Sequence, residues 1–322
     1  MKYAFDSTIS PSRISLGTVS IGSDIPPRES FALFDAYTAA GGNFIDTAHL
    51  YSIWEENGEG ASERTIGEWL RVHGARKDLF LATKGAHPHR DTMHIPRCAP
   101  EEIEQDLNES LERLGVDSVD LYFLHRDDPS LPAGDLIETL AAFHRDGRIK
   151  NAGVSNWSTA RIDEANAYAA QHHLPPLVAN QPRWALADRV HEMPPSDNTL
   201  DLDEPMRQWH ERTGLILTPF TAQAKGFFGA DNAAWAKAGF NGPAPRGARY
   251  DGPQNRRRLT RAIQLAEEHA CTPNQIALAY LLSQPFPVYP IIGTHNPAHV
   301  IEALGAADIR LTPKSCATLR NA

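Results

Sequence analysis

Short apolar runs alternate with helical segments along nearly the whole chain. This alternation constrains the fold more than any other feature of the sequence. Eight runs rich in apolar and β-branched residues are predicted strands, at residues 14–19, 43–48, 79–84, 119–125, 150–155, 177–181, 215–220 and 288–292. Several are apolar at nearly every position, which is typical of parallel strands buried on both faces. The sequence therefore predicts an α/β protein built on a parallel sheet.

Amphipathic helices are predicted between these runs. The clearest covers residues 100–114: it opens with Pro-Glu-Glu, which suits a helix amino terminus, and it ends before Gly115. Its apolar residues, among them Ile103, Leu107 and Leu111, recur on one face. The other predicted helices are residues 61–72, 136–144, 160–171, 205–212, 258–270 and 273–283.

Two architectures accommodate eight strands that alternate with helices: a closed (β/α)8 TIM barrel and an open, doubly wound sheet. An open sheet that binds a dinucleotide has a GxGxxG turn after its first strand, whereas residues 16–22 read LGTVSIG. No proline- or serine-rich linker divides the chain. Residues 226–255 are rich in glycine and follow a strand, so an active-site loop is predicted there. We expect residues 1–322 to form a single barrel domain.

Charge and composition exclude some classes of function. The 322 residues carry a formal net charge of −9, so no binding to nucleic acid is expected, and the three successive arginines at 256–258 are predicted to lie on a solvated helix face. The first residues lack the pattern of a secretion signal, so no secretion is expected. No run approaches 18 apolar residues, so no membrane span is expected. Three widely spaced cysteines fit a reducing compartment, and we predict a cytoplasmic protein.

Polar or aromatic residues stand at the carboxyl ends of six predicted strands. They are Asp46 with Tyr51 close behind it, Lys84, His125, Ser155 with Asn156, Gln181, and Phe220 with Thr221. Any one of them, such as a strand-ending aspartate, is most simply a cap for a turn or helix. Polar or aromatic residues at the ends of six strands are hard to explain by capping alone. The active site of a barrel lies at the carboxyl ends of its strands, so a shared site explains them better.

Asp46, Tyr51, Lys84 and His125 together suggest acid–base chemistry with a phenol. A free tyrosine has a pKa near ~10, which a neighbouring lysine ammonium would lower, and a carboxylate would keep that lysine charged. A histidine can polarise a carbonyl oxygen beside a proton donor, and carbonyl reduction requires this arrangement. No side chain supplies hydride, so a nicotinamide cofactor is implied.

The segments that carry these residues, GGNFIDTAHLY, LATKG, DLYFLH, GVSN and ANQ, resemble in their order the aldo-keto reductase superfamily. The resemblance extends from about residue 15 to about residue 304, and residues 62–67, Arg249 and Asn255 are similar to the bacterial and potassium-channel-β-like branch. It implies an NAD(P)(H)-dependent oxidoreductase that reduces an aldehyde or ketone, or oxidises the alcohol. The catalytic tetrad that it implies, with the tyrosine as general acid, is Tyr51, Lys84, Asp46 and His125.

The resemblance also implies where the dinucleotide would bind. Ser155, Asn156 and Gln181 match contacts to the nicotinamide amide, and Phe220 takes the place of the usual stacking tyrosine. The segment 221–226 would approach the pyrophosphate. The implied cofactor-binding residues are Thr18, Asp46, Ser155, Asn156, Gln181, Phe220, Thr221, Gln223, Lys225, Gly226, Gly293, Thr294, His295, His299 and Glu302.

Two positions after the last strand differ from relatives that use NADP. His295 stands where those relatives have lysine or arginine, and His299 stands where they have glutamine or arginine. A neutral imidazole is a weaker phosphate partner than a guanidinium. The family favours NADP(H), which we predict as the cofactor, with NAD(H) as the alternative.

The expected partner is a small carbonyl compound or alcohol, such as a sugar. Trp54, His87 and His125 are the predicted substrate contacts, although Trp54 fits the core of its own loop equally well. The histidines within residues 87–94 could instead serve a metal-dependent barrel hydrolase or isomerase, but the predicted chemistry needs no metal and none is expected. Another alternative is a redox-sensing regulatory subunit with slow turnover. The sequence leaves the oligomeric state open.

Overall fold

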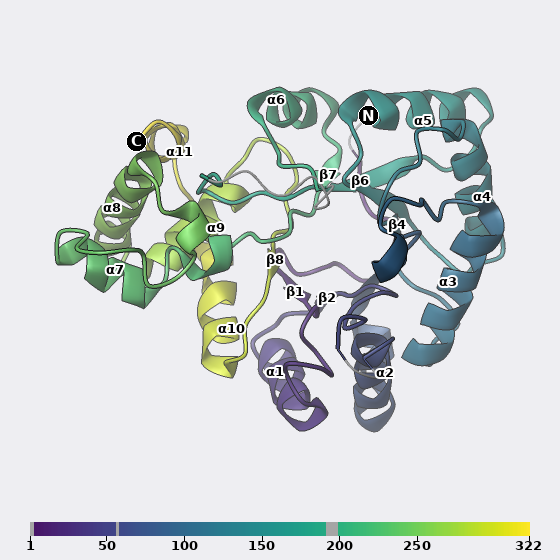
Figure 1. Ribbon diagram of the computed structural model, residues 1–322, viewed down its shortest axis with the longest axis horizontal. Coiled ribbons are helices and arrows are strands. Elements are labelled where there is room, and N and C mark those ends of the chain that lie inside the picture. The colour runs from purple at the N-terminus through teal and green to yellow at the C-terminus, as the bar shows by residue number, and fades with distance from the viewer. Residues whose placement is uncertain (1–2, 56–57, 191–198) are drawn as a thin grey trace.

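A parallel sheet of eight strands, curled into a barrel, lies at the centre of the computed structural model, which describes residues 3–55, 58–190 and 199–322 (Figure 1). The strands are β1 (Ser15–Gly17), β2 (Phe44–Asp46), β3 (Phe80–Gly85), β4 (Leu121–Leu124), β5 (Ala152–Ser155), β6 (Leu177–Gln181), β7 (Ile216–Leu217) and β8 (Ile291–Ile292). Their order is β7-β6-β5-β4-β3-β2-β1-β8. The predicted barrel fold is confirmed, and each strand lies inside a predicted run except β3, which ends one residue beyond its run, at Gly85.

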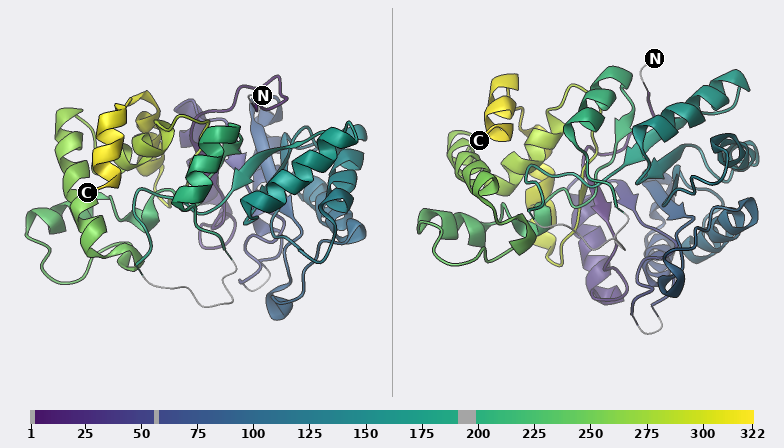
Figure 2. Two further views of the ribbon diagram at one scale, coloured as in Figure 1. Left: turned by 90° about the horizontal axis from the view of Figure 1, so that it is seen from above. Right: turned by 45° about the horizontal axis from the view of Figure 1, so that its top comes forward.

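Helices surround the strands on the outside of the barrel (Figures 1 and 2). They are α1 (Pro27–Ala39), α2 (Ala61–His73), α3 (Pro100–Leu114), α4 (Ala133–Arg145), α5 (Thr159–Gln171), α6 (Glu204–Thr213), α7 (Ala230–Lys237), α8 (Pro253–Glu268), α9 (Pro273–Leu282), α10 (Pro297–Leu304) and α11 (Pro313–Arg320). Among the described residues, no helix is long and apolar enough to cross a bilayer.

The helix ends follow from local sequence. Helix α3 has proline in its first turn, and the Glu102 carboxylate accepts a hydrogen bond from the backbone N–H of Ala99. It ends at Gly115, whose φ of 64° is a conformation that glycine adopts readily. Helix α9 begins at a reciprocal cap between Thr272 and Gln275.

Two predictions outside the site are wrong. The stretch 226–255 is not one long loop, because it contains helix α7 and the start of helix α8. The arginines at 256–258 do not share a solvated face. Arg258 is buried and donates to the backbone oxygens of Leu186 and Arg320, so the α8 helix carries a cation on its inner face.

Aromatic side chains fill the inside of the barrel away from the predicted site. Phe44, Phe80 and Phe123 belong to one buried cluster in the barrel, and Phe5 from the amino-terminal segment packs against it. The ring centroids of Phe5 and Phe80 are 4.8 Å apart. Because this aromatic cluster fills the interior of the barrel, the carboxyl ends of the strands are the place where polar side chains can meet.

The barrel closes between β7 and residues 287–291 by backbone hydrogen bonds around one isolated bridge, among them Leu217 N to Pro287 O at 2.9 Å. Leu217 and Val288 form an isolated parallel bridge, Tyr289 N donates to Leu217 O at 2.8 Å, and Ile291 N donates to Pro219 O at 3.0 Å. Prolines at 285, 287 and 290 lack the N–H groups that a continuous ladder requires. This closure is therefore less regular than the pairing of the other strands.

Candidate active site

Lys84, at the carboxyl end of β3, brings the predicted tetrad together. Its Nζ atom lies 2.5 Å from Asp46 Oδ1 and 3.0 Å from the Tyr51 hydroxyl, and it also donates to Thr47 O at 2.7 Å. Lys84 and Asp46 are almost completely buried. All three donor positions of the ammonium therefore have partners, which holds the lysine in one orientation.

The charges in this group act on each other. Burial works to lower the pKa of Lys84, but the attraction of Asp46 and then of Tyr51 outweighs it, so the pKa is raised and the lysine stays charged. Burial raises the pKa of Tyr51, and the charge of Lys84 only partly opposes this effect. Lys84 therefore lowers the pKa of Tyr51 as expected, but burial outweighs this effect and the net shift is upward. Tyr51 is a neutral proton donor at pH 7.

His125 follows β4 and lies beside Tyr51. The two rings are edge to face with centroids 6.1 Å apart. Burial, followed by the positive charges and the second imidazole nearby, holds the pKa of His125 well below its usual range, so the ring is neutral. Its Nδ1 atom is buried and has no partner in the described part of the chain. A buried lone pair is tolerated better than a buried unpaired N–H, so the proton resides on Nε2.

A second hydrogen-bonded group lies next to the tetrad. Gln181 Nε2 donates to Asp46 Oδ2 at 2.9 Å, and Ser155 Oγ donates to the backbone oxygen of Gln181 at 2.7 Å. Asn156 has a φ of 61°, and its Nδ2 donates to Ser155 Oγ at 2.9 Å. These side chains are nearly buried and brought together by β5 and β6. The hydroxyl of Thr18, which is also buried, donates to Asp46 O instead of facing a cavity.

The segment 221–226 has an unusual backbone conformation. Thr221, Ala224, Lys225 and Gly226 all have positive φ, and the N–H groups of Ala224 and Gly226 donate within the segment, to Thr221 O and Gln223 O. Lys225 is exposed, and the Cβ position of Gly293, on the neighbouring segment, faces open space. Gln223 Oε1 accepts a hydrogen bond from Gly293 N at 3.1 Å, which joins the two segments. They form a cradle that a phosphate group would fit.

The remaining predicted cofactor residues lie around the start of α10. His295 and His299 are exposed, and His299 Nδ1 lies 3.4 Å from Thr294 Oγ1. Glu302 is different, because its carboxylate accepts hydrogen bonds from Thr272 and Asn274 at the start of α9. Phe220 is partly buried, with the guanidinium of Arg183 5.3 Å from its ring centroid.

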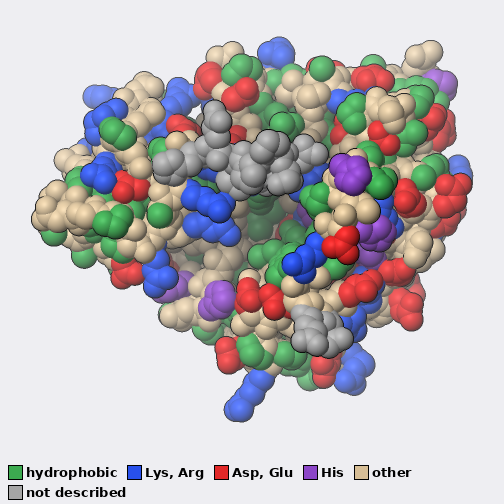
Figure 3. Space-filling model, viewed as in Figure 1, with side chains coloured by type: hydrophobic (Ala, Val, Ile, Leu, Met, Phe, Trp, Pro, Cys, Tyr) green, Lys and Arg blue, Asp and Glu red, His purple; other side chains and the backbone are tan. Residues whose placement is uncertain are grey.

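The predicted substrate contacts differ in burial. Trp54 is 37% exposed, so it does not belong to a loop core. His87 is buried, and its ring packs edge to face against His125 with centroids 4.9 Å apart. Figure 3 shows a hollow near the centre of the face seen in Figure 1, with hydrophobic side chains inside it and basic side chains at its edge.

Several residues that shape the site carry no signal in the sequence. Thr47 acts through its backbone oxygen, and Thr218 Oγ1 accepts from Gln181 Nε2 at 3.3 Å. Arg126 follows His125 and lowers the pKa of both His125 and His87. Its position directly after a strand-ending histidine was the only available hint.

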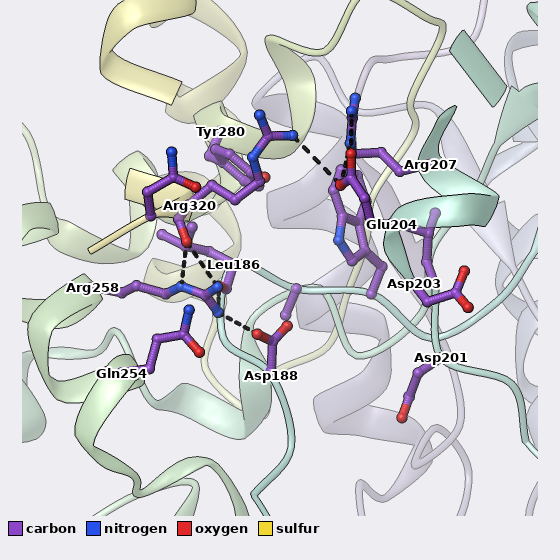
Figure 4. A pocket seen from close by; sticks show the side chains of 14 residues that line it. Leu186, Asp188, Asp201, Asp203, Glu204, Arg207, Gln254, Arg258, Tyr280 and Arg320 are labelled. Carbon is purple, nitrogen blue, oxygen red and sulfur yellow. Dashed lines mark hydrogen bonds and ion pairs between the residues drawn. The ribbon is translucent and has the colours of Figure 1, made fainter. Parts of the chain in front are cut away.

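Other groupings are separate from the tetrad. Among the described residues, no group of three or more His, Cys, Asp or Glu side chains is placed to hold a metal ion. A pocket of about 650 Å³ lies between α6, α8, α9 and α11, and none of its lining residues is a predicted site residue. Figure 4 shows two ion pairs in its lining, Arg258 with Asp188 and Arg320 with Glu204.

Comparison with known proteins gives consistent results. The chain matches the sequence profile described as the Aldo/keto reductase family over residues 13–322. It is 30% identical over 299 residues to aldo-keto reductase str7 of Strobilurus tenacellus, covering 91% of this chain and 80% of that protein. It is 30% identical over 304 residues to norsolorinic acid reductase stcV of Emericella nidulans, covering 88% and 70% respectively.

Two further relatives extend the comparison. Aldo-keto reductase yakc [NADP(+)] of Schizosaccharomyces pombe is 27% identical over 330 residues, covering 96% of this chain and 92% of that protein. A crystal structure of a thermostable aldo-keto reductase with the inhibitor epalrestat superposes with a TM-score of 0.72 at 23% identity, covering 99% of both chains. This structural likeness supports the fold.

Proposed function

Because this chain belongs to the Aldo/keto reductase family, we propose that it is an NADP(H)-dependent oxidoreductase that reduces an aldehyde or ketone to the alcohol, with Tyr51 as the proton donor. The observation that carries this proposal is the position of Lys84 Nζ, within hydrogen-bond distance of both Asp46 and the Tyr51 hydroxyl. A neutral phenol beside a fixed ammonium suits proton donation to a developing alkoxide.

Each tetrad member has a distinct role in the proposed reaction. A bound nicotinamide supplies hydride to the carbonyl carbon. Tyr51 donates its proton to the carbonyl oxygen, and the resulting phenolate is stabilised by Lys84. Asp46 keeps the lysine charged and fixed. His125 donates from Nε2 to the same carbonyl oxygen and so orients it, because its Nδ1 is the unprotonated, buried atom.

The polar groups around the tetrad fit a dinucleotide. The segment 221–226 is joined to Gly293 through Gln223, and its exposed Lys225 would hold the pyrophosphate. His295 and His299 lie beside the first turn of α10, where a 2′-phosphate would be accepted. Ser155, Asn156 and Gln181 would orient the nicotinamide amide. The name of the yakc relative, which includes NADP(+), favours NADP(H) over NAD(H).

Replacing Tyr51 with phenylalanine tests the proposal. We expect Tyr51→Phe to lower kcat for carbonyl reduction by roughly 100-fold to 10,000-fold, because positioned acid–base groups contribute about that much. NADPH affinity, measured by quenching of tryptophan fluorescence, should stay close to that of the wild type. The same titration with NADH determines the preferred cofactor.

Tyr168→Phe is the matched control, because Tyr168 lies on α5 and its hydroxyl donates to Glu138 on α4, on the outside of the barrel. Its turnover should equal that of the wild type. Wild-type turnover by Tyr51→Phe would contradict the proposed role of the phenol, and a wild-type protein with no affinity for either dinucleotide would contradict the proposed function.

A further inference from the structure

His87 is held rigidly at the edge of the candidate site. The N–H of the preceding residue, Ala86, donates to Asp106 Oδ2 at 2.8 Å, and Arg97 Nη1 donates to the backbone oxygen of His87 at 3.3 Å. Arg97 and Asp106 are themselves joined by two hydrogen bonds of 3.1 and 2.8 Å. A buried ion pair thus fixes the backbone on both sides of the His87 Cα atom, which is typical of a side chain that must keep its direction.

The tautomer of His87 follows from its single protein partner. Its Nδ1 atom lies 2.7 Å from the backbone oxygen of Pro88. A carbonyl oxygen can only accept, so Nδ1 carries the proton. Burial lowers the pKa of this imidazole to about 4, so the ring is neutral at pH 7 and Nε2 carries a lone pair. In the described chain Nε2 has no hydrogen-bond partner, and it is not among the fully enclosed atoms without one.

The site therefore offers two donors and one acceptor around the His125 ring. The Tyr51 hydroxyl and His125 Nε2–H are donors for a carbonyl oxygen. The ring of His87 packs against the same imidazole, 4.9 Å from it, with an accepting nitrogen. A carboxylate on the substrate would meet this lone pair unfavourably, whereas a hydroxyl would donate to it.

From this arrangement we propose that His87 selects α-hydroxy carbonyl substrates, by accepting a hydrogen bond from the hydroxyl next to the carbonyl group. This inference rests on the proposed reductase function and adds a substrate class to it. A substrate without the hydroxyl would cover this rigid acceptor and leave it unpaired, which is the condition under which a site discriminates strongly between a substrate and its deoxy analogue.

A matched pair of ketones tests the inference. The ratio of kcat/KM for hydroxyacetone to that for acetone is measured with NADPH in wild type, His87→Phe and His87→Gln. Comparing ratios between proteins cancels the different intrinsic reactivities of the ketones. We expect His87→Phe, which keeps an aromatic ring but has no acceptor, to lower the ratio about 10-fold, mainly through KM for hydroxyacetone. His87→Gln keeps an acceptor oxygen and should retain most of the ratio.

His89→Phe is the control, because His89 is an exposed histidine in the same segment and should leave the ratio unchanged. An unchanged ratio in His87→Phe, with kcat/KM lowered equally for both ketones, would mean that His87 only packs against His125, and would overturn the inference while leaving the reductase function intact. If the wild type reduces neither ketone, glycolaldehyde and acetaldehyde replace them. Reduction of other carbonyl compounds but of neither hydroxy compound would also overturn the inference. No reduction of any carbonyl compound would contradict the reductase function itself.

Discussion

At the scale of the residue, protonation states decide what the site can do. Tyr51 and both histidines beside it are neutral at pH 7 because burial disfavours their charged forms, whereas Lys84 remains charged because Asp46 lies 2.5 Å away. The positive charge that is hydrogen-bonded to the phenol is therefore on the lysine. Proton donation by Tyr51 consequently does not depend on a histidine that titrates near neutral pH.

These protonation states predict the pH dependence of the reaction. The pKa of Tyr51 is raised above its ordinary value near 10, so the protonated donor persists through alkaline pH. We expect kcat for reduction to be flat between about pH 6 and 9, and kcat for alcohol oxidation, which needs the phenolate, to rise with pH over that range. Stopped-flow single-turnover rates in both directions would measure this. A fall in kcat for reduction as the pH rises through about 6.5 would show that the reaction needs a charged histidine, and would contradict this prediction.

The sequence predicted the tetrad because its four residues stand at or just after strand ends, and a barrel brings those ends together. It did not predict the direction of the Tyr51 pKa shift, because that shift depends on burial, which a strand-end position does not report. The acceptor role of His87 was also beyond the sequence, because it depends on the distance from Nδ1 to Pro88 O. A role that depends on a backbone atom can be played by almost any residue type, so the sequence does not reveal it.

At the scale of the element, buried polar side chains join helix α8 to its neighbours: Asn255 exchanges hydrogen bonds with the backbone of Asp188, and Arg258 makes further bonds. Arg258 donates to Leu186 O at 3.0 Å and to Arg320 O at 2.9 Å, and it pairs with Asp188 at 2.7 Å. It thereby links the segment after β6 to the last residues of α11. Runs of basic residues are usually solvated. The sequence pattern alone therefore could not show that Arg258 faces inward whereas Arg257 does not.

We expect Arg258→Leu to lower the free energy of unfolding by about 3 kcal/mol, because it removes the donor from the buried oxygen of Leu186 and from the partly buried oxygen of Arg320. Urea unfolding followed by tryptophan fluorescence would measure this. Arg257→Leu, on the exposed neighbouring position, is the control and should change the free energy by less than about 0.5 kcal/mol. Equal effects of the two substitutions would mean that Arg258 does not fasten the helix.

Helices with an incomplete apolar stripe were missed. The inner face of α1 includes the buried Ser30 beside Leu33, Phe34 and Tyr37, so its pattern is interrupted by a polar residue. Ser30 is accommodated because its hydroxyl donates to Ile25 O at 3.0 Å. Helices α7, α10 and α11 each have eight residues, which is too short for a periodic pattern to stand out.

At the scale of the whole molecule, buried neutral histidines couple stability to pH. His210, in α6, is enclosed, with Nδ1 donating to Leu215 O at 3.0 Å and Nε2 accepting from Asn180 Nδ2 at 3.2 Å. Burial lowers its pKa to about 4. His87 and His125 are shifted in the same direction. Below pH 6.5 these histidines bind protons in the unfolded chain but stay neutral in the folded chain.

We therefore expect the free energy of unfolding to fall as the pH decreases from 6.5 towards 5, by up to about 1.4 kcal/mol per pH unit for each such histidine. Carboxylates with lowered pKa values, such as Glu204 with a pKa of about 2, add their effect only at lower pH. Urea unfolding at a series of pH values would measure the slope. His210→Gln should be less stable at pH 7 but have a shallower slope, and an unchanged slope would contradict this coupling.

The irregular closure between β7 and residues 287–291 has a consequence for the loaded protein. The 221–226 segment continues from one side of that junction and Gly293 from the other, so a dinucleotide held by both would bridge the irregular junction of the barrel. Opening the barrel there would require release of the ligand, so occupancy and resistance to unfolding would rise together.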